Sequence, residues 1–115
     1  MINGYSIVTL CGSTKFEKEF KETQRKLTID GYIVISCGLF GHGSDKEYFE
    51  SLSLDQQNDL KKSLDKIHKS KIDLSDAIVV INPNGYIGES TKNEIEYAKK
   101  HNKKIMYLEE PKEKN

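Results

Sequence analysis

The sequence predicts an α/β fold, a three-layer sandwich in which helices cover both faces of a small parallel sheet. Four short apolar runs, at residues 6–10, 32–36, 77–82 and 104–108, alternate with longer segments whose apolar residues have helical spacing. Strands joined by right-handed helical crossovers would lie in the order 2-1-3-4, counted along the chain. Ligands of such sheets bind at the carboxyl ends of the strands, where loops and helix amino-termini meet. We therefore look for function in the loops that follow the first and third strands.

The composition predicts one compact domain, which we place at residues 1–110, followed by a polar tail at residues 111–115. Of the 115 residues 36% are hydrophobic and 31% charged, which is typical of neither a disordered nor a membrane protein. The 18 basic and 18 acidic residues give no net field that would attract a nucleic acid polymer or an anionic membrane. The start, MINGYSIVTL, lacks a basic segment before a long apolar run, and no run approaches the ~18 apolar residues of a spanning helix. We expect a soluble, cytoplasmic protein.

The first strand leads into Cys11, Gly12, Ser13 and Thr14. A glycine here would let the chain turn sharply and let a ligand approach the backbone, while the two hydroxyls would lie beside free helix N–H groups. Thr14 and Glu17 match the T-x-x-E capping box, which predicts that a helix begins there and runs to a terminator at residue 31, a glycine. The segment suits a phosphate or ribose, although the simpler interpretation is a plain turn followed by a helix cap.

The middle of the chain carries two histidines of interest. A glycine-rich segment at 38–44 holds His42, either a substrate contact or an ordinary solvated loop residue. Residues 45–53 fit a short helix or an irregular lid. Ser53 and Gln56 then form a second capping-box pattern, and helical spacing continues to about residue 70. His68 lies near the expected end of that helix, where it is a boundary residue or a functional one.

The loop after the third strand, NPNGYIGES, contains two glycines before the next helix, expected at about 91–101. Its backbone N–H groups and small residues suit an anion at the amino-terminus of that helix. The candidate ligand contacts in this loop are Gly85, Tyr86, Gly88, Glu89 and Ser90.

Glu94 on the following helix has two interpretations. Thr91 and Glu94 match T-x-x-E, so the glutamate could simply complete a helix cap. However, Glu96 has Lys100 four residues on, whereas Glu94 has Ala98, and so lacks the partner of an ordinary solvated carboxylate. A carboxylate turned into a cleft at the strand ends can act as a nucleophile or a base.

The cysteines and histidines predict no metal site and no cofactor. Cys11 and Cys37 form neither a disulfide framework nor a C-x-x-C motif, and small buried hydrophobic residues near strand ends have this pattern. His42, His68 and His101 have no ligand spacing with them.

Together these motifs resemble the nucleoside 2-deoxyribosyltransferase superfamily, and within it the 2'-deoxynucleoside 5'-phosphate N-hydrolases. The likeness rests on a strand ending in CGS, the SDAIVV strand, the glycine-bearing loop, E-x-x-x-A in NEIEYA, and the KIMYL strand. It implies a Rossmann-like or flavodoxin-like fold in which Glu94 attacks the anomeric carbon of the sugar. Gly12, Ser13 and Thr14 would hold the sugar phosphate, and Ser90 would add a second anion contact.

The chain departs from that family at three positions. Thr9 stands where the hydrolases have an aromatic hydroxyl, His68 where a carboxylate is expected, and Cys37 where the second strand ends in a histidine. The group that protonates the leaving base is therefore open: His68 is a candidate replacement, and the alternatives are Asp65, Asp73 and Tyr86.

The resemblance implies cleavage or transfer of the N-glycosidic bond of a nucleoside or nucleotide, including the deoxy forms. The alternative is a non-catalytic module that binds a nucleotide-derived ligand on the same fold. Because so small a sheet leaves a shallow cleft, we expect a homodimer or larger homo-oligomer in which a neighbour closes the site, through residues 45–53.

Overall fold

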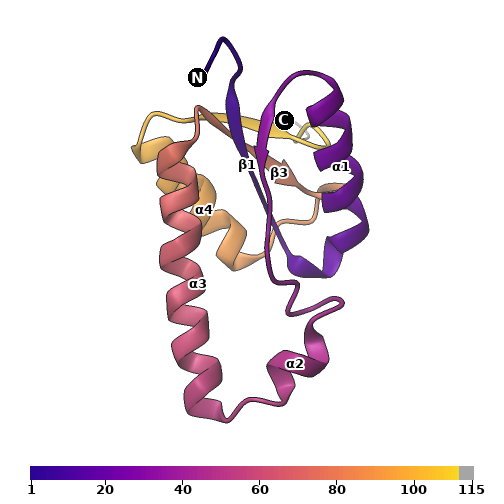
Figure 1. Cartoon of the computed structure of the whole chain (residues 1–115), viewed down its shortest axis with the longest axis vertical. Coiled ribbons are helices and arrows are strands. Elements are labelled where there is room, and N and C mark those ends of the chain that lie inside the picture. Colours follow the sequence, from indigo (N-terminus) through magenta and orange to yellow (C-terminus); the bar gives the residue numbers. More distant parts are fainter. Residues whose placement is uncertain (112–115) are drawn as a thin grey trace.

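The computed structural model describes residues 1–111 and contains a four-stranded parallel sheet (Figure 1). The strand order is β2-β1-β3-β4, as the sequence predicts. The central strands pair from Val8 with Ala77 to Gly12 with Ile81, so their carboxyl ends finish level with each other. The strands are β1 (Ile7–Gly12), β2 (Ile33–Ile35), β3 (Ala77–Ile81) and β4 (Lys104–Tyr107).

Helices cover both faces of the sheet, which makes the predicted three-layer arrangement. Alternate residues of β1 and β3 point to opposite faces, so each strand contributes side chains to two separate apolar clusters. One cluster joins Val8 and Leu10 to Phe20 of α1, and the other joins Ile78 and Val80 to residues of α3 and α4. The helices are α1 (Glu17–Ile29), α2 (Lys46–Glu50), α3 (Leu54–Leu74) and α4 (Glu89–Lys100), with short 3-10 turns at Thr14–Phe16 and Pro83–Gly85.

The helix α3 has 21 residues and continues to Leu74, past the end near residue 70 that the sequence predicts. It begins with the predicted capping box, in which Ser53 and Gln56 bond to each other's backbone N–H. Its amino-terminal half projects beyond the sheet, and the short α2 lies near its tip (Figure 1). Residues 45–53 are therefore mainly helical, and α2 with the amino-terminal half of α3 forms an arm beside the carboxyl ends of the strands.

Two other capping boxes predicted from T-x-x-E are wrong. Ser13 caps the 3-10 turn before α1, and the Oε1 of Glu17 accepts a hydrogen bond from the backbone N–H of Ser44 at 2.8 Å instead. The helix α4 begins two residues before Thr91, with Gly88 at its N-cap position, and Thr91 is buried inside the first turn. In both patterns the glutamate contacts another element, Glu17 through Ser44 and Glu94 through His68.

Gly12 does not turn the chain off the strand, as the sequence suggested, because β1 extends through it. A Cβ at Gly12 would lie 2.8 Å from the carbonyl oxygen of Ile81 and 3.3 Å from the ring of Phe20, so close packing requires the glycine. The predicted terminator Gly31 is confirmed, since it follows α1 with φ of 95°.

The predicted polar tail lies outside the described residues except for Pro111. Within the described part of the chain, none of the helices is both long enough and apolar enough to cross a lipid bilayer.

Candidate functional site

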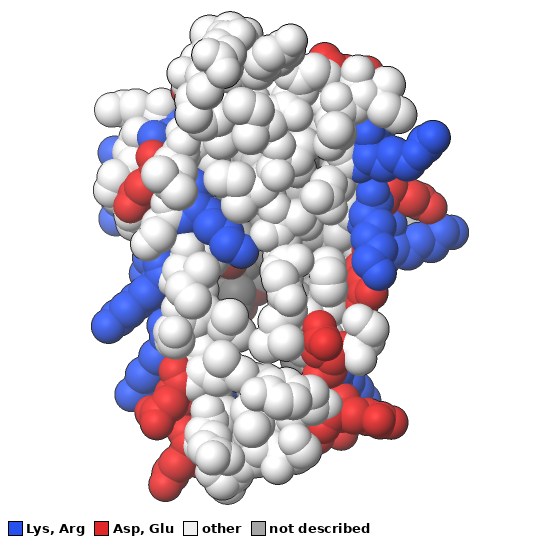
Figure 2. Space-filling view, viewed as in Figure 1, with Lys and Arg blue, Asp and Glu red and all other residues white. Residues whose placement is uncertain are grey.

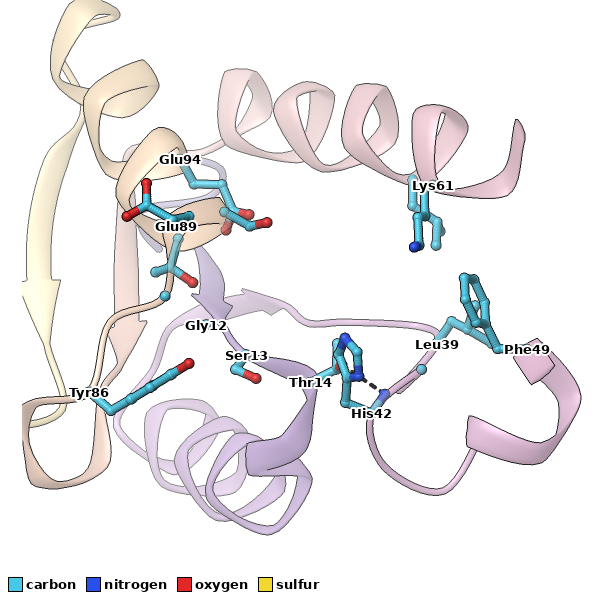
Figure 3. Close-up of a pocket in the computed structure, with 15 residues that line it drawn as sticks. Gly12, Ser13, Thr14, Leu39, His42, Phe49, Lys61, Tyr86, Glu89 and Glu94 are labelled. Atoms are coloured by element: carbon cyan, nitrogen blue, oxygen red, sulfur yellow. Dashed lines mark hydrogen bonds between the residues drawn. The ribbon is translucent and has the colours of Figure 1, made fainter. Parts of the chain in front are cut away.

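A cavity of about 450 Å³ opens at the carboxyl ends of β1 and β3. One side is formed by the loop after β1 and the start of α4, and the other by the segment after β2 together with α2 and α3 (Figure 3). Seven of the residues that the sequence singles out line it: Gly12, Ser13, Thr14, Tyr86, Gly88, Glu89 and Ser90. Glu94 also lines it, and it faces Lys61 across the cavity. The two predicted loops therefore do meet at one site.

The loop after β1 holds the glycine-rich segment in place. Oγ1 of Thr14 accepts a hydrogen bond from the backbone N–H of His42 at 3.0 Å, drawn as a dashed line in Figure 3. Glu17 binds the next turn through Ser44, and its ion pair with Lys21 at 2.7 Å together with that bond lowers its pKa to about 2. His42 lines the cavity as a result.

The amino-terminus of α4 offers free backbone donors to the cavity. Gly88 makes no side-chain cap bond, and Gly88, Glu89, Ser90 and Thr91 all line the cavity. The first N–H groups of a helix have no partner within the helix, and the helix dipole favours an anion there. With the hydroxyls of Ser13 and Thr14 opposite, this end of the cavity suits a phosphate or carboxylate.

Glu94 lies in the second turn of α4, and the capping interpretation is wrong for it. Its Oε1 is 3.1 Å from Nε2 of His68 on α3, and the two side chains are 17% and 22% exposed. A carboxylate used as a cap would bond back to the helix start, whereas this one lies against a histidine of a neighbouring helix. Glu94 is therefore a half-buried carboxylate at a cavity wall.

Cys11 completes a cluster behind Glu94. Its Sγ is 3.2 Å from Nε2 of His68, and one potential ligand atom from each of Cys11, His68 and Glu94 lies within 4.8 Å of the others. Burial, with the charge of Glu94 and a hydrogen bond to it, raises the pKa of the Cys11 thiol well above its usual value. Cys11 is thus a neutral thiol, and neither it nor His68 lines the cavity.

Other residues that the sequence singles out lie elsewhere. Gly85 lines a separate hollow beside Asn82 and Glu109. Thr9 is fully buried, with Oγ1 2.6 Å from Oγ of Ser75. The Sγ of Cys37 donates to the carbonyl oxygen of Leu39 at 2.9 Å.

Of the three alternative proton donors, only Tyr86 lines the cavity. Its hydroxyl points toward the loop that carries Ser13 (Figure 3), and Nζ of Lys15 lies 3.7 Å from the centre of its ring. Asp65 pairs with Lys69 at 3.2 Å on the surface of α3. Asp73 accepts a hydrogen bond from the hydroxyl of Tyr97 at 2.8 Å.

The far wall contains residues that sequence reasoning missed: Leu39, Phe49, Lys61 and Leu64. Nζ of Lys61 lies 5.5 Å from the centre of the Phe49 ring, and both residues line the cavity. No local motif marks these residues, because they reach the site only through the way α2 and α3 fold back.

The arrangement unites backbone and hydroxyl donors at one end, a half-buried carboxylate and apolar walls in one cavity. Such a combination can bind a phosphorylated or polar small molecule and present a carboxylate to it. In comparisons with family models, curated proteins and solved structures, none matches this chain.

Proposed function

We propose that the protein cleaves or transfers the N-glycosidic bond of a nucleoside or nucleotide, including deoxy forms, with Glu94 as the nucleophile. The observation that carries the proposal is the position of Glu94, which lines the cavity and is held by His68 instead of serving as a helix cap. The likeness to the nucleoside 2-deoxyribosyltransferase superfamily supports the same assignment.

In the proposed reaction a carboxylate oxygen of Glu94 bonds to the anomeric carbon as the bond from that carbon to the base nitrogen breaks. The transition state has a cationic sugar, which the negative carboxylate stabilises before it forms the covalent bond. Water, or a second base in a transfer reaction, then displaces the glutamate. No cofactor takes part.

His68 is best explained as a positioning residue in this reaction. Its Nε2 lies 3.1 Å from Oε1 of Glu94 and so restricts the direction of the carboxylate, and the imidazole does not itself line the cavity. Tyr86 is the predicted proton donor that lines the cavity, so we assign protonation of the leaving base to its hydroxyl.

The anion-binding end would hold a 5'-phosphate. The free N–H groups at the start of α4 and the hydroxyls of Ser13, Thr14 and Ser90 supply its donors. The only arginine of the chain, Arg25, lies on the exposed surface of α1, so these donors act without a bidentate guanidinium. We therefore expect moderate affinity for phosphate.

A non-catalytic module that binds a nucleotide-derived ligand is the second candidate. It is favoured by Thr9 and Cys37, which differ from the residues of the resembled family at these positions. Thr9 hydrogen-bonds to Ser75 and Cys37 to Leu39, and neither lines the cavity. The same cavity would then bind its ligand without turnover.

We also propose that the protein acts in the cytoplasm as a homodimer or larger homo-oligomer. The arm formed by α2 and the start of α3 exposes Tyr48 and Leu54, which are 57% and 77% accessible. A second copy that covers these side chains would also close the open side of the cavity.

The decisive experiment incubates the protein with nucleosides and their 5'-phosphates, including the deoxy forms, and separates free bases by chromatography. We expect release of a free base from at least one substrate, with the 5'-phosphate favoured over the nucleoside. Binding of a nucleotide without release of base would select the binding module instead. If Ser13→Ala and Ser90→Ala leave the preference for phosphate unchanged, the anion assignment is wrong.

A further inference from the structure

The cluster behind the cavity contains three different kinds of metal ligand. Cys11 comes from β1, His68 from α3 and Glu94 from α4, and they offer a thiol, an imidazole and a carboxylate. Their Sγ, Nε2 and carboxylate oxygen all lie within 4.8 Å of one another. Sulfur, nitrogen and oxygen donors in this combination are the ligands that proteins use for Zn²⁺.

Two of the three separations between these atoms are close to those around a tetrahedral ion. With Zn–S of about 2.3 Å and Zn–N or Zn–O of about 2.0–2.2 Å, adjacent ligand atoms are roughly 3.3–3.6 Å apart. The observed separations are 3.2 Å between Sγ of Cys11 and Nε2 of His68, and 3.1 Å between that nitrogen and Oε1 of Glu94. The third pair, Sγ of Cys11 and the carboxylate oxygen of Glu94, lies within 4.8 Å, so the side chains would draw together around an ion.

Charge also favours a divalent ion at this place. A thiolate and a carboxylate would balance the two positive charges, so that the half-buried site becomes neutral. Cys11 is fully buried, whereas Glu94 lines the cavity. The fourth position would therefore face the cavity, as the open position of a three-ligand zinc site does.

We propose that Cys11, His68 and Glu94 bind Zn²⁺ or a similar thiophilic divalent cation, and that the bound ion withdraws Glu94 from reaction. On binding, the thiol releases its proton to solvent, and Nε2 of His68 coordinates the ion with the ring proton on Nδ1. The carboxylate that would attack a sugar becomes a metal ligand. Glu94 therefore cannot bind the ion and attack a sugar at the same time.

The binding part of this proposal is independent of the enzymatic one, and only the inhibition rests on the proposed function. Chelator-treated protein is titrated with Zn²⁺ in a calorimeter, and Co²⁺ is added to a parallel sample for spectroscopy. We expect one equivalent of Zn²⁺ to bind, and the Co²⁺ form to show tetrahedral d–d bands with a thiolate-to-cobalt charge-transfer band.

The variants Cys11→Ser, His68→Gln and Glu94→Gln should each weaken binding on the order of 100-fold or more. Cys37→Ser and His101→Gln are the matched controls, because both residues lie outside the cluster. They should keep both the affinity and the charge-transfer band. Circular dichroism of each variant establishes that it is folded, and the charge-transfer band of the unaltered protein tests thiolate ligation without any variant.

Absence of stoichiometric binding, or a Co²⁺ spectrum without the thiolate band, overturns the site. Equal loss of affinity in the control variants does the same. In the activity assay, Zn²⁺ should stop release of base by the unaltered protein and have at least tenfold less effect on Cys11→Ser. If Zn²⁺ binds as described but Glu94→Gln retains turnover, the proposed nucleophile fails and the metal site stands.

Discussion

The side chain of Glu94 combines two features that separate a reactive carboxylate from a structural one. It lines the cavity, and its partner is His68 on another helix instead of a lysine one turn away. On the same helix Glu96 is exposed and lies 3.7 Å from Lys99, the usual arrangement of a solvated residue. The contrast between the two glutamates provides an internal control for the assignment.

We expect Glu94→Gln to abolish release of base while leaving the melting temperature nearly unchanged. Glutamine keeps the size and a hydrogen-bonding oxygen but cannot form the glycosyl ester, so the rate should fall on the order of 10³-fold or more. Glu96→Gln is the matched control and should keep full activity. Rates are measured by chromatography of free base, and stability by thermal denaturation. Near-normal turnover of Glu94→Gln would move the search to Glu89, the other carboxylate on the cavity wall.

Glu17 should make the stability of the loop that carries His42 dependent on pH. The ion pair with Lys21 and the bond from Ser44 lower its pKa from 4.5 to about 2. Because the folded value is depressed, this stabilisation is present above about pH 4.5 and is lost as the pH falls toward 2. Glu17→Gln should therefore lower the melting temperature at about pH 7, and the difference should shrink at about pH 3.

Glu22→Gln is the control for that effect, because Glu22 is exposed on the same helix and lies 3.8 Å from Lys18. It should change the melting temperature little at either pH. A deficit of Glu17→Gln that stays constant across the range would show that the loop is held by the shape of the side chain and not by its charge.

At the scale of the elements, the contact between β1 and β3 fixes the position of both site loops. Gly12 is the last residue of β1 and pairs with Ile81 at the end of β3. Ser13 and Thr14 follow it directly, so any displacement of Gly12 moves the hydroxyls that we propose bind an anion. A glycine is needed here for close packing and not for an unusual backbone angle.

Gly12→Ala should destabilise the protein by about 1–3 kcal/mol, the usual cost of overpacking. The new Cβ would lie 2.8 Å from the carbonyl oxygen of Ile81, a backbone atom that cannot rotate away. Gly38→Ala is the control, because a Cβ there meets nothing within 4 Å. Urea denaturation of both variants measures the difference. Equal stability of the two would mean that β1 and β3 separate more easily than their pairing suggests.

The strands and their order were predictable from sequence because a buried strand is a short apolar run. Such a run can be recognised without knowing which strand it pairs with. The T-x-x-E patterns failed for the opposite reason, since Glu17 and Glu94 have tertiary partners that compete with the local cap. Ser53 and Gln56 obey the rule on the exposed arm, where nothing competes. The cluster of Cys11, His68 and Glu94 depends on the packing of three elements, so no spacing could reveal it.

At the scale of the whole molecule, the arm of α2 and α3 makes the shape asymmetric. Its inner side supplies Phe49, Lys61 and Leu64 to the cavity, and its tip exposes Tyr48 and Leu54. On the face shown in Figure 2, charged side chains gather along the two flanks and toward the arm, and the centre is largely uncharged. With equal numbers of acidic and basic residues, the chain has no net charge to keep two copies apart.

We expect the protein to be a dimer or larger at micromolar concentration by size-exclusion chromatography with light scattering, with the arm in the interface. Stable interfaces bury about 1,200–2,000 Å² in total, and exposed apolar residues at a projecting tip are the kind of surface that such contacts cover. Leu54→Asp tests this without weakening the fold, because an acidic residue in the first turn of α3 suits the helix dipole.

The matched control is Leu74→Lys, since Leu74 is 69% exposed at the other end of α3 and a basic residue suits that end. Leu54→Asp should dissociate the assembly and raise the KM for substrate, because the open side of the cavity loses its cover, while Leu74→Lys should change neither. A monomeric unaltered protein with full activity would mean that the chain's own arm closes the site unaided.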